Sequence, residues 1–124
     1  MIEWRNDMIE ELVSRVFALR NATHLAHWAT KSYAEHKALG KFYDDLIDKI
    51  DAIVEAYQGW YGLIGDVTLR AMPKTNITDK IREELTWIAQ NREKIAKKNT
   101  MMENLIDDLM QSYSVTHYKL VNLS

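Results

Sequence analysis

The residues that interrupt helices are confined to one part of this chain. Its only proline, Pro73, and three of its four glycines, Gly59, Gly62 and Gly65, lie between residues 59 and 73. Proline and glycine are the strongest local helix breakers, so long uninterrupted segments can form on either side of this stretch. The distribution therefore favours an all-α protein with one irregular connection near the middle of the chain.

Apolar residues recur every three or four positions in four segments, as they do in amphipathic helices. We expect helices over residues of about 7–31, 33–58, 78–98 and 100–120. The second segment shows the clearest bundle seam, formed by Leu39, Tyr43, Leu46, Ile50, Ile53 and Tyr57. Seams with this spacing are typical of helices that pack around a shared core.

Helix boundaries are predicted from residues that supply missing backbone hydrogen bonds. Asp7, Thr78 and Thr100 stand where the side chain of an N-cap residue is expected. Gly59 follows the second periodic segment and is expected to end it, because glycine is common just after a helix.

The length of 124 residues suits one domain, so we predict a single helical domain over residues 1–124. The connection from Gly59 to Ile77 is long for a tight hairpin and carries many apolar residues. It can run the length of the bundle and make the second and third helices parallel, as in ferritin-like folds. The sequence therefore predicts a ferritin-like four-helix bundle with a long crossover.

Composition excludes several classes of site and partner. There is no cysteine, so any metal site must be built from His, Asp and Glu. No nucleophile motif or phosphate-binding glycine loop is present. The chain opens with no signal peptide and has no apolar run long enough to span a membrane, so a cytoplasmic location is expected. The net charge of −2 and the acidic first ten residues do not support nucleic-acid binding.

Candidate metal ligands lie on the first two predicted helices. Asp51 and Glu55 are four residues apart, so their carboxylates sit one helical turn apart and can share an ion. His36 lies about four turns away on the same helix, too far to join them within one chain. His27, followed by Trp28, ends the apolar face of the first helix. Two chains related by a two-fold axis can bring such separated ligands together.

The stretch from Leu19 to Gln58, LRNATHLAHWATKSYAEHKALGKFYDDLIDKIDAIVEAYQ, resembles the Dps mini-ferritins, members of the ferritin-like superfamily. In that family, His-Trp is followed by a short loop, and the next helix carries His and then an Asp four residues on. An Asp and a Glu, four residues apart, follow further along. The specific likeness covers about a third of the chain, and the last two predicted helices match only in length and order.

The resemblance implies that His27, His36, Asp51 and Glu55 hold iron, the histidines coming from one subunit and the carboxylates from its two-fold mate. It further implies a ferroxidase that oxidises Fe(II) with peroxide or oxygen, in a homo-oligomer that is at least a dimer and can be a cage. Two departures stand out. Gly40 occupies the position of the family's first Asp, and the segment between the two histidines is shorter by about three residues.

These departures leave two functions open. The leading hypothesis is a Dps-like mini-ferritin that binds and oxidises iron, with Trp28 and Gly40 near the site. The alternative is a ferritin-like bundle that has lost its catalysis and acts as an oligomeric structural or interaction protein.

Overall fold

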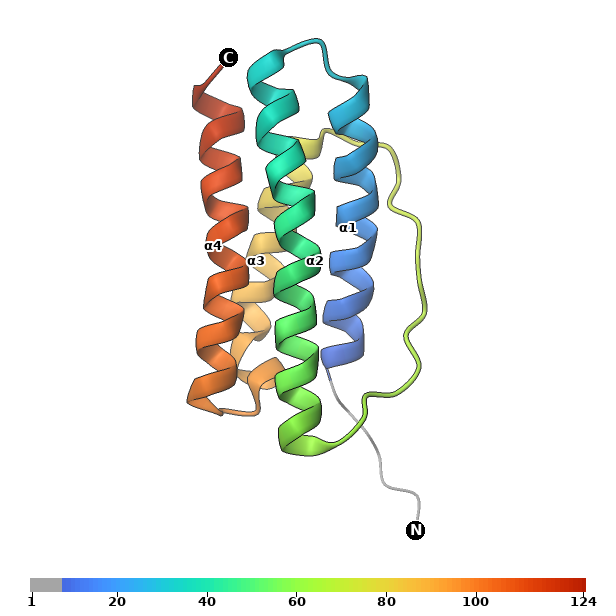
Figure 1. Ribbon diagram of the computed structural model, residues 1–124, viewed down its shortest axis with the longest axis vertical. Coiled ribbons are helices and arrows are strands. Elements are labelled where there is room, and N and C mark those ends of the chain that lie inside the picture. The colour runs from blue at the N-terminus through green and yellow to red at the C-terminus, as the bar shows by residue number, and fades with distance from the viewer. Residues whose placement is uncertain (1–7) are drawn as a thin grey trace.

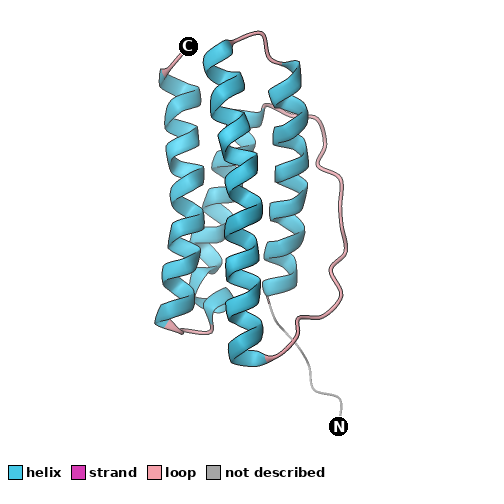
Figure 2. Ribbon diagram, in the orientation of Figure 1, coloured by secondary structure: helices cyan, strands magenta, loops and turns pink. Residues whose placement is uncertain are grey.

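The computed structural model describes residues 8–124 and consists of four α-helices joined by loops (Figures 1 and 2). The helices are α1 (Ile9–Ala29), α2 (Tyr33–Tyr61), α3 (Ile77–Ala96) and α4 (Thr100–Asn122). No strand occurs among the described residues. The predicted all-α four-helix bundle is confirmed.

The order of the helices around the bundle follows from which pairs touch. Helix α1 packs on α2 and α3, and α4 packs on the same two helices, so α1 lies diagonally opposite α4. The connection formed by residues 62–76 runs along the outside of the bundle from one end to the other (Figure 1). This crossover makes α2 parallel to α3, the connectivity predicted from its length and known from ferritin-like folds.

The core is a single cluster to which all four helices contribute. Its largest fully buried side chains include Tyr57 and Tyr113, and Phe42 meets Tyr113 edge to face with ring centroids 5.1 Å apart. Burial raises the pKa of the Tyr113 hydroxyl far above its usual value. In the part of the chain that the structure describes, these buried residues form one continuous cluster.

Helix α2 continues past the glycine that was expected to end it. Gly59 lies inside the helix, and a Cβ at that position would meet nothing within 4 Å. The helix ends at Gly62, whose φ of 95° is a conformation that side-chain-bearing residues rarely adopt. The prediction for Gly59 was wrong because periodicity cannot tell which of several glycines takes the positive φ.

Two predicted N-caps are displaced by asparagines. Asn76 caps α3 and Asn99 caps α4, each accepting a hydrogen bond from a backbone N–H of the first turn. Thr78 and Thr100, the predicted caps, lie inside the helices. Asparagine ranks above threonine as an N-cap, which accounts for the shift. The predicted cap at Asp7 lies outside the described residues.

The crossover is fastened to α1 by polar contacts as well as by apolar packing. The Ser14 hydroxyl donates to the Thr68 carbonyl at 2.6 Å, and Arg70 pairs with Glu11 at 2.7 Å. Burial would raise the pKa of Glu11, but hydrogen bonds from Arg70 and Arg15 outweigh it and leave that pKa lowered. Among residues 8–124, none of the helices combines the length and apolar character that crossing a bilayer requires.

Candidate functional site

The short turn between α1 and α2 brings His27 and His36 together. Nδ1 of His27 lies 2.6 Å from the carbonyl oxygen of His36, and Nδ1 of His36 lies 2.9 Å from the carbonyl oxygen of His27. Their rings stack with centroids 3.7 Å apart and planes inclined by 17°. We call this reciprocal arrangement the histidine clasp. It fastens α1 to α2 beside the turn that joins them.

The clasp fixes which nitrogen of each ring is available for chemistry. A carbonyl oxygen can only accept, so Nδ1 of both His27 and His36 must donate a hydrogen. Each neutral imidazole then has its lone pair on Nε2. Histidines that bind metals commonly donate their other ring N–H to a backbone carbonyl in this way. Both rings are therefore in the tautomer in which Nε2 can bind a metal.

Stacking limits how the two rings can share metal ions. The lone pair of Nε2 lies in the plane of its ring, and two nearly parallel planes do not converge on a single ion between them. As they stand, His27 and His36 suit two separate ions better than one shared ion.

Gly40 makes room for the clasp. A Cβ on Gly40 would come within 2.9 Å of Cε1 and 3.2 Å of Nδ1 of the His27 ring. The His27 imidazole thus occupies the space beside Gly40 that an Asp side chain at this position, as in the Dps family, would need. An Asp at position 40 would require the clasp to shift.

Further rings surround the clasp, and the sequence did not indicate them as a group. His24 stacks on Tyr43 with centroids 4.1 Å apart and also lies 4.5 Å from Trp28. Tyr43 meets His27 edge to face at 5.3 Å, and the Arg20 guanidinium lies 5.2 Å above the Tyr43 ring. Tyr43 was predicted only as a seam residue. The signal that could have identified it is its position seven residues after His36, on the same side of α2.

Solvent reaches this region through a surface hollow. A cavity of about 980 Å³ is lined by both clasp histidines, by Tyr43 and by polar residues of α2 and α4. Trp28, predicted near the site, is 67% exposed and does not line this cavity. Small solutes can therefore approach the clasp without a rearrangement of the bundle.

The two candidate carboxylates lie elsewhere on the chain. Asp51 and Glu55 are both exposed on α2, and neither makes a hydrogen bond or ion pair with another described residue. Asp51 is fifteen residues from His36, about 22 Å along a helix. Among residues 8–124, no three His, Asp or Glu side chains form a group that could hold a metal ion. The structure brings His27 and His36 together, but does not bring Asp51 and Glu55 to them.

Comparisons with known proteins give a family without an activity. A model described as "Family of unknown function (DUF5856)" matches residues 27–120, a range that includes all four candidate ligands. An uncharacterized 14.6 kDa protein of the mobD-ri intergenic region of Enterobacteria phage T4 is 40% identical over 53 residues. That match spans 43% of this chain and 41% of the phage protein. No solved structure matches the chain.

Proposed function

This chain belongs to DUF5856, a family of unknown function, and from its own side chains we propose that it is a mini-ferritin-like iron-binding protein. In this proposal, His27 and His36 of one subunit and Asp51 and Glu55 of a two-fold mate hold Fe(II) for oxidation. The protein would act in the cytoplasm as a homo-oligomer.

The hydrogen bonds of the clasp are the observation that carries the proposal. Two neighbouring imidazoles are held with Nδ1 engaged and Nε2 unengaged, beside a hollow open to solvent. Iron accepts imidazole nitrogen together with carboxylate oxygen. Asp51 and Glu55 supply two carboxylates one turn apart with no partner of their own among the described residues.

The chemistry assigned to these residues is binding and charge compensation. Two Fe(II) ions supply the two electrons that reduce one hydrogen peroxide to two waters, with uptake of two protons. The product Fe(III) carries more charge than Fe(II), and the two carboxylates offset it. Dioxygen is the alternative oxidant. In this proposal each of the two rings would bind one Fe(II), and the two ions together would supply both electrons.

A second function is favoured by a specific contact. Close packing of His27 against Gly40, together with the reciprocal hydrogen bonds, accounts for both histidines as a structural fastening of the hairpin. In this second candidate, the protein is an oligomeric structural or interaction protein without catalysis. It predicts the same clasp but no use for Asp51 and Glu55.

Anaerobic Fe(II) titration of the metal-free protein distinguishes the two candidates. The informative variant replaces Asp51 and Glu55 by Ala. The matched control replaces Asp79 and Glu83 by Ala, an exposed pair with the same spacing on α3, away from the hollow. Both variants change only exposed side chains, so circular dichroism should show intact helices.

We expect saturable Fe(II) binding and oxidation in the wild type and in the Asp79/Glu83 control, and loss of both in the Asp51/Glu55 variant. Equal binding in all three proteins would overturn the ligand assignment. Absence of binding in the wild type would overturn the iron proposal and leave the structural candidate.

A further inference from the structure

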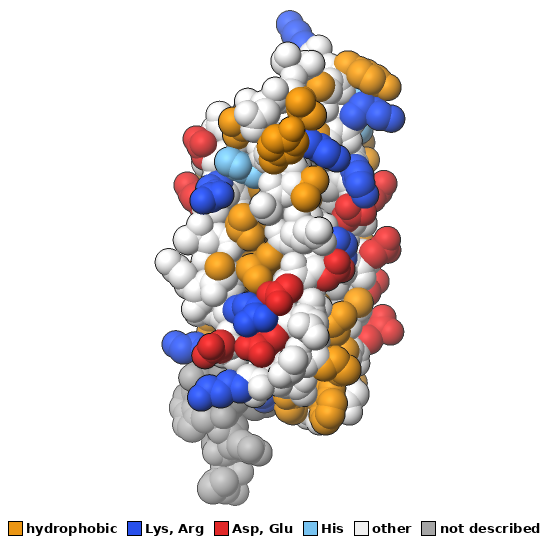
Figure 3. Space-filling view, turned by 90° about the vertical axis from the view of Figure 1, so that its left-hand side faces the viewer, with side chains coloured by type: hydrophobic (Ala, Val, Ile, Leu, Met, Phe, Trp, Pro, Cys, Tyr) orange, Lys and Arg blue, Asp and Glu red, His pale blue; other side chains and the backbone are white. Residues whose placement is uncertain are grey.

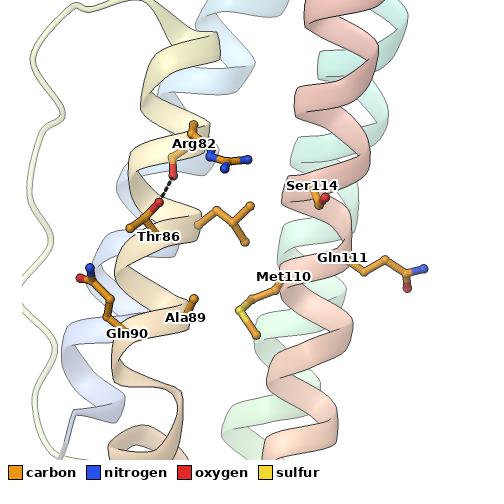
Figure 4. Close-up of a pocket in the computed structure, with 8 residues that line it drawn as sticks. Arg82, Thr86, Ala89, Gln90, Met110, Gln111 and Ser114 are labelled. Atoms are coloured by element: carbon orange, nitrogen blue, oxygen red, sulfur yellow. Dashed lines mark hydrogen bonds between the residues drawn. The ribbon is translucent and has the colours of Figure 1, made fainter.

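The face formed by α3 and α4 carries an apolar groove that no described part of the chain covers. In the space-filling view, hydrophobic side chains run down this face and stop at a cluster of charged residues (Figure 3). The groove has a volume of about 650 Å³, and its apolar lining includes Leu85, Ala89 and Met110. Figure 4 shows Met110 reaching from α4 toward Ala89 on α3. About one turn beyond Ala89 and Met110, Arg92 of α3 pairs with Glu103 and Asp107 of α4.

The outer edge of α3 along this groove is charged only at its two ends. Arg82, Thr86, Ala89 and Glu93 follow each other at spacings of four, three and four residues, so they form one stripe along the helix. All four residues are exposed. The side chains of Arg82 and Glu93 form no ion pair with any described residue. The Thr86 hydroxyl is satisfied by the Arg82 carbonyl at 3.0 Å, as Figure 4 shows.

This stripe is complementary in charge to a reversed copy of itself. Suppose that the α3 helix of a second copy lies antiparallel to this one, with a two-fold axis midway between residues 87 and 88. Each residue of the stripe then faces the residue of the other copy that lies at the same distance from the axis in the opposite direction along the sequence. Arg82 then faces Glu93 of the other copy, and Thr86 faces Ala89. Each ion pair lies about 8 Å from the axis along the helix. The uncharged residues fall at the axis, where the helices approach most closely.

We propose that the α3–α4 face is a two-fold interface between copies of this chain, with antiparallel α3 helices paired through Arg82 and Glu93. A second copy would cover the apolar groove and give both charges a partner. The isologous arrangement uses each residue twice, as a two-fold axis requires.

This interface is independent of the proposed iron site. The iron site requires a mate on α1 and α2, on the opposite side of the bundle from the α3–α4 face. The exposed stripe on α2 is less suited to unaided self-association, because it carries Asp44, Asp48, Asp51 and Glu55 in succession. The α3–α4 pairing needs no cation, so it should persist in a chelator.

Charge reversal on the full chain tests the pairing. Arg82→Glu and Glu93→Arg each replace two attractive pairs by two repulsive ones, and the double variant restores attraction in reversed order. We expect the mass from light scattering in EDTA to show a dimer for the wild type and the double variant. In each single variant, the Kd of the dimer should rise by about tenfold or more. Lys94→Glu, an exposed charge one position from Glu93, is the control and should leave the dimer intact.

Three results would overturn the proposal. One is a monomeric wild type across the accessible concentrations, and another is unchanged dimerisation in both single variants. The third is a double variant that fails to recover, because recovery depends on Arg82 and Glu93 facing each other across the axis. Ala89→Arg adds a check from the apolar side, since a charged side chain at an exposed position should leave the helix folded but block the groove.

Discussion

The bundle contains two helical hairpins whose turns are closed by different means. The α1–α2 turn, residues 30–32, is closed by the histidine clasp, in which two stacked rings donate to backbone carbonyls. The α3–α4 turn, residues 97–99, is closed by Lys97 and Lys98 at positive φ and by the Asn99 cap. Beside it, Arg92 pairs on the surface with Asp107.

The contrast shows that a hairpin of this bundle can be closed without histidine. Ordinary caps and exposed ion pairs suffice at the α3–α4 turn. At the α1–α2 turn, the two histidines that fasten the hairpin also line a hollow on the surface. The side chains that fasten the α1–α2 turn are therefore the same ones that we propose as metal ligands, whereas no candidate ligand closes the α3–α4 turn.

Removing a clasp ring should have the largest effect on stability. His36→Ala removes the hydrogen bond that its Nδ1 donates to the His27 carbonyl and also the ring stack, but it keeps the backbone carbonyl that accepts from His27. We expect a loss of about 2 kcal/mol in the free energy of unfolding. Urea denaturation measures it. His36→Phe keeps a ring without its nitrogens and should lose less. If His36→Ala unfolds at the wild-type midpoint, the clasp is not what closes this hairpin.

Two glycines of α2 offer a matched comparison with opposite signs. Gly40→Ala places a Cβ 2.9 Å from the His27 ring and should destabilise the protein by about 1–2 kcal/mol. Gly59→Ala meets nothing within 4 Å and should stabilise it by up to about 1 kcal/mol through helix propensity. Thermal denaturation of both variants compares them directly. Stabilisation by Gly40→Ala would show that His27 does not occupy the space beside Gly40.

Replacing one of the two positive-φ lysines of the α3–α4 turn by glycine should stabilise the protein. Lys98 has φ of 58°, and Lys98→Gly should raise the free energy of unfolding by about 0.5–1 kcal/mol. Lys94→Gly is the control, because Lys94 lies in the last turn of α3 and should lose stability instead. A destabilised Lys98→Gly variant would mean that the lysine side chain contributes more than its backbone costs.

The surface ion pair beside that turn should matter least. Arg92→Ala is expected to lower the free energy of unfolding by less than about 1 kcal/mol, since the side chains of Arg92 and Asp107 are both substantially exposed. A hydrogen bond from Arg92 lowers the pKa of Asp107 despite some opposing desolvation. A carboxyl with a lowered pKa stabilises the fold above its ordinary pKa, and this contribution fades as the pH falls through the lowered value. Acid titration of stability should therefore be slightly flatter in Arg92→Ala.

The periodic segments predicted the bundle because hydrophobic spacing and the placement of helix breakers are local properties. The ends of the helices were harder to predict from the sequence. Several neighbouring residues could have served as caps, and the structure uses Gly62 and the two asparagines. The pairing of His27 with His36 was suggested by the family pattern, but the reciprocal hydrogen bonds and the role of Gly40 depend on how α1 and α2 pack. Periodicity along one helix carries no information about that packing distance.

The tautomers of His27 and His36 test the account most directly, because both the clasp and the availability of Nε2 depend on them. Long-range proton–nitrogen correlation spectra of ¹⁵N-labelled protein, at a pH where the rings are neutral, report which nitrogen carries the hydrogen. The account predicts Nδ1–H with an unprotonated Nε2 for both residues, the less common form in free imidazole side chains. Finding Nε2–H on either ring would contradict the clasp and remove the basis for metal binding there.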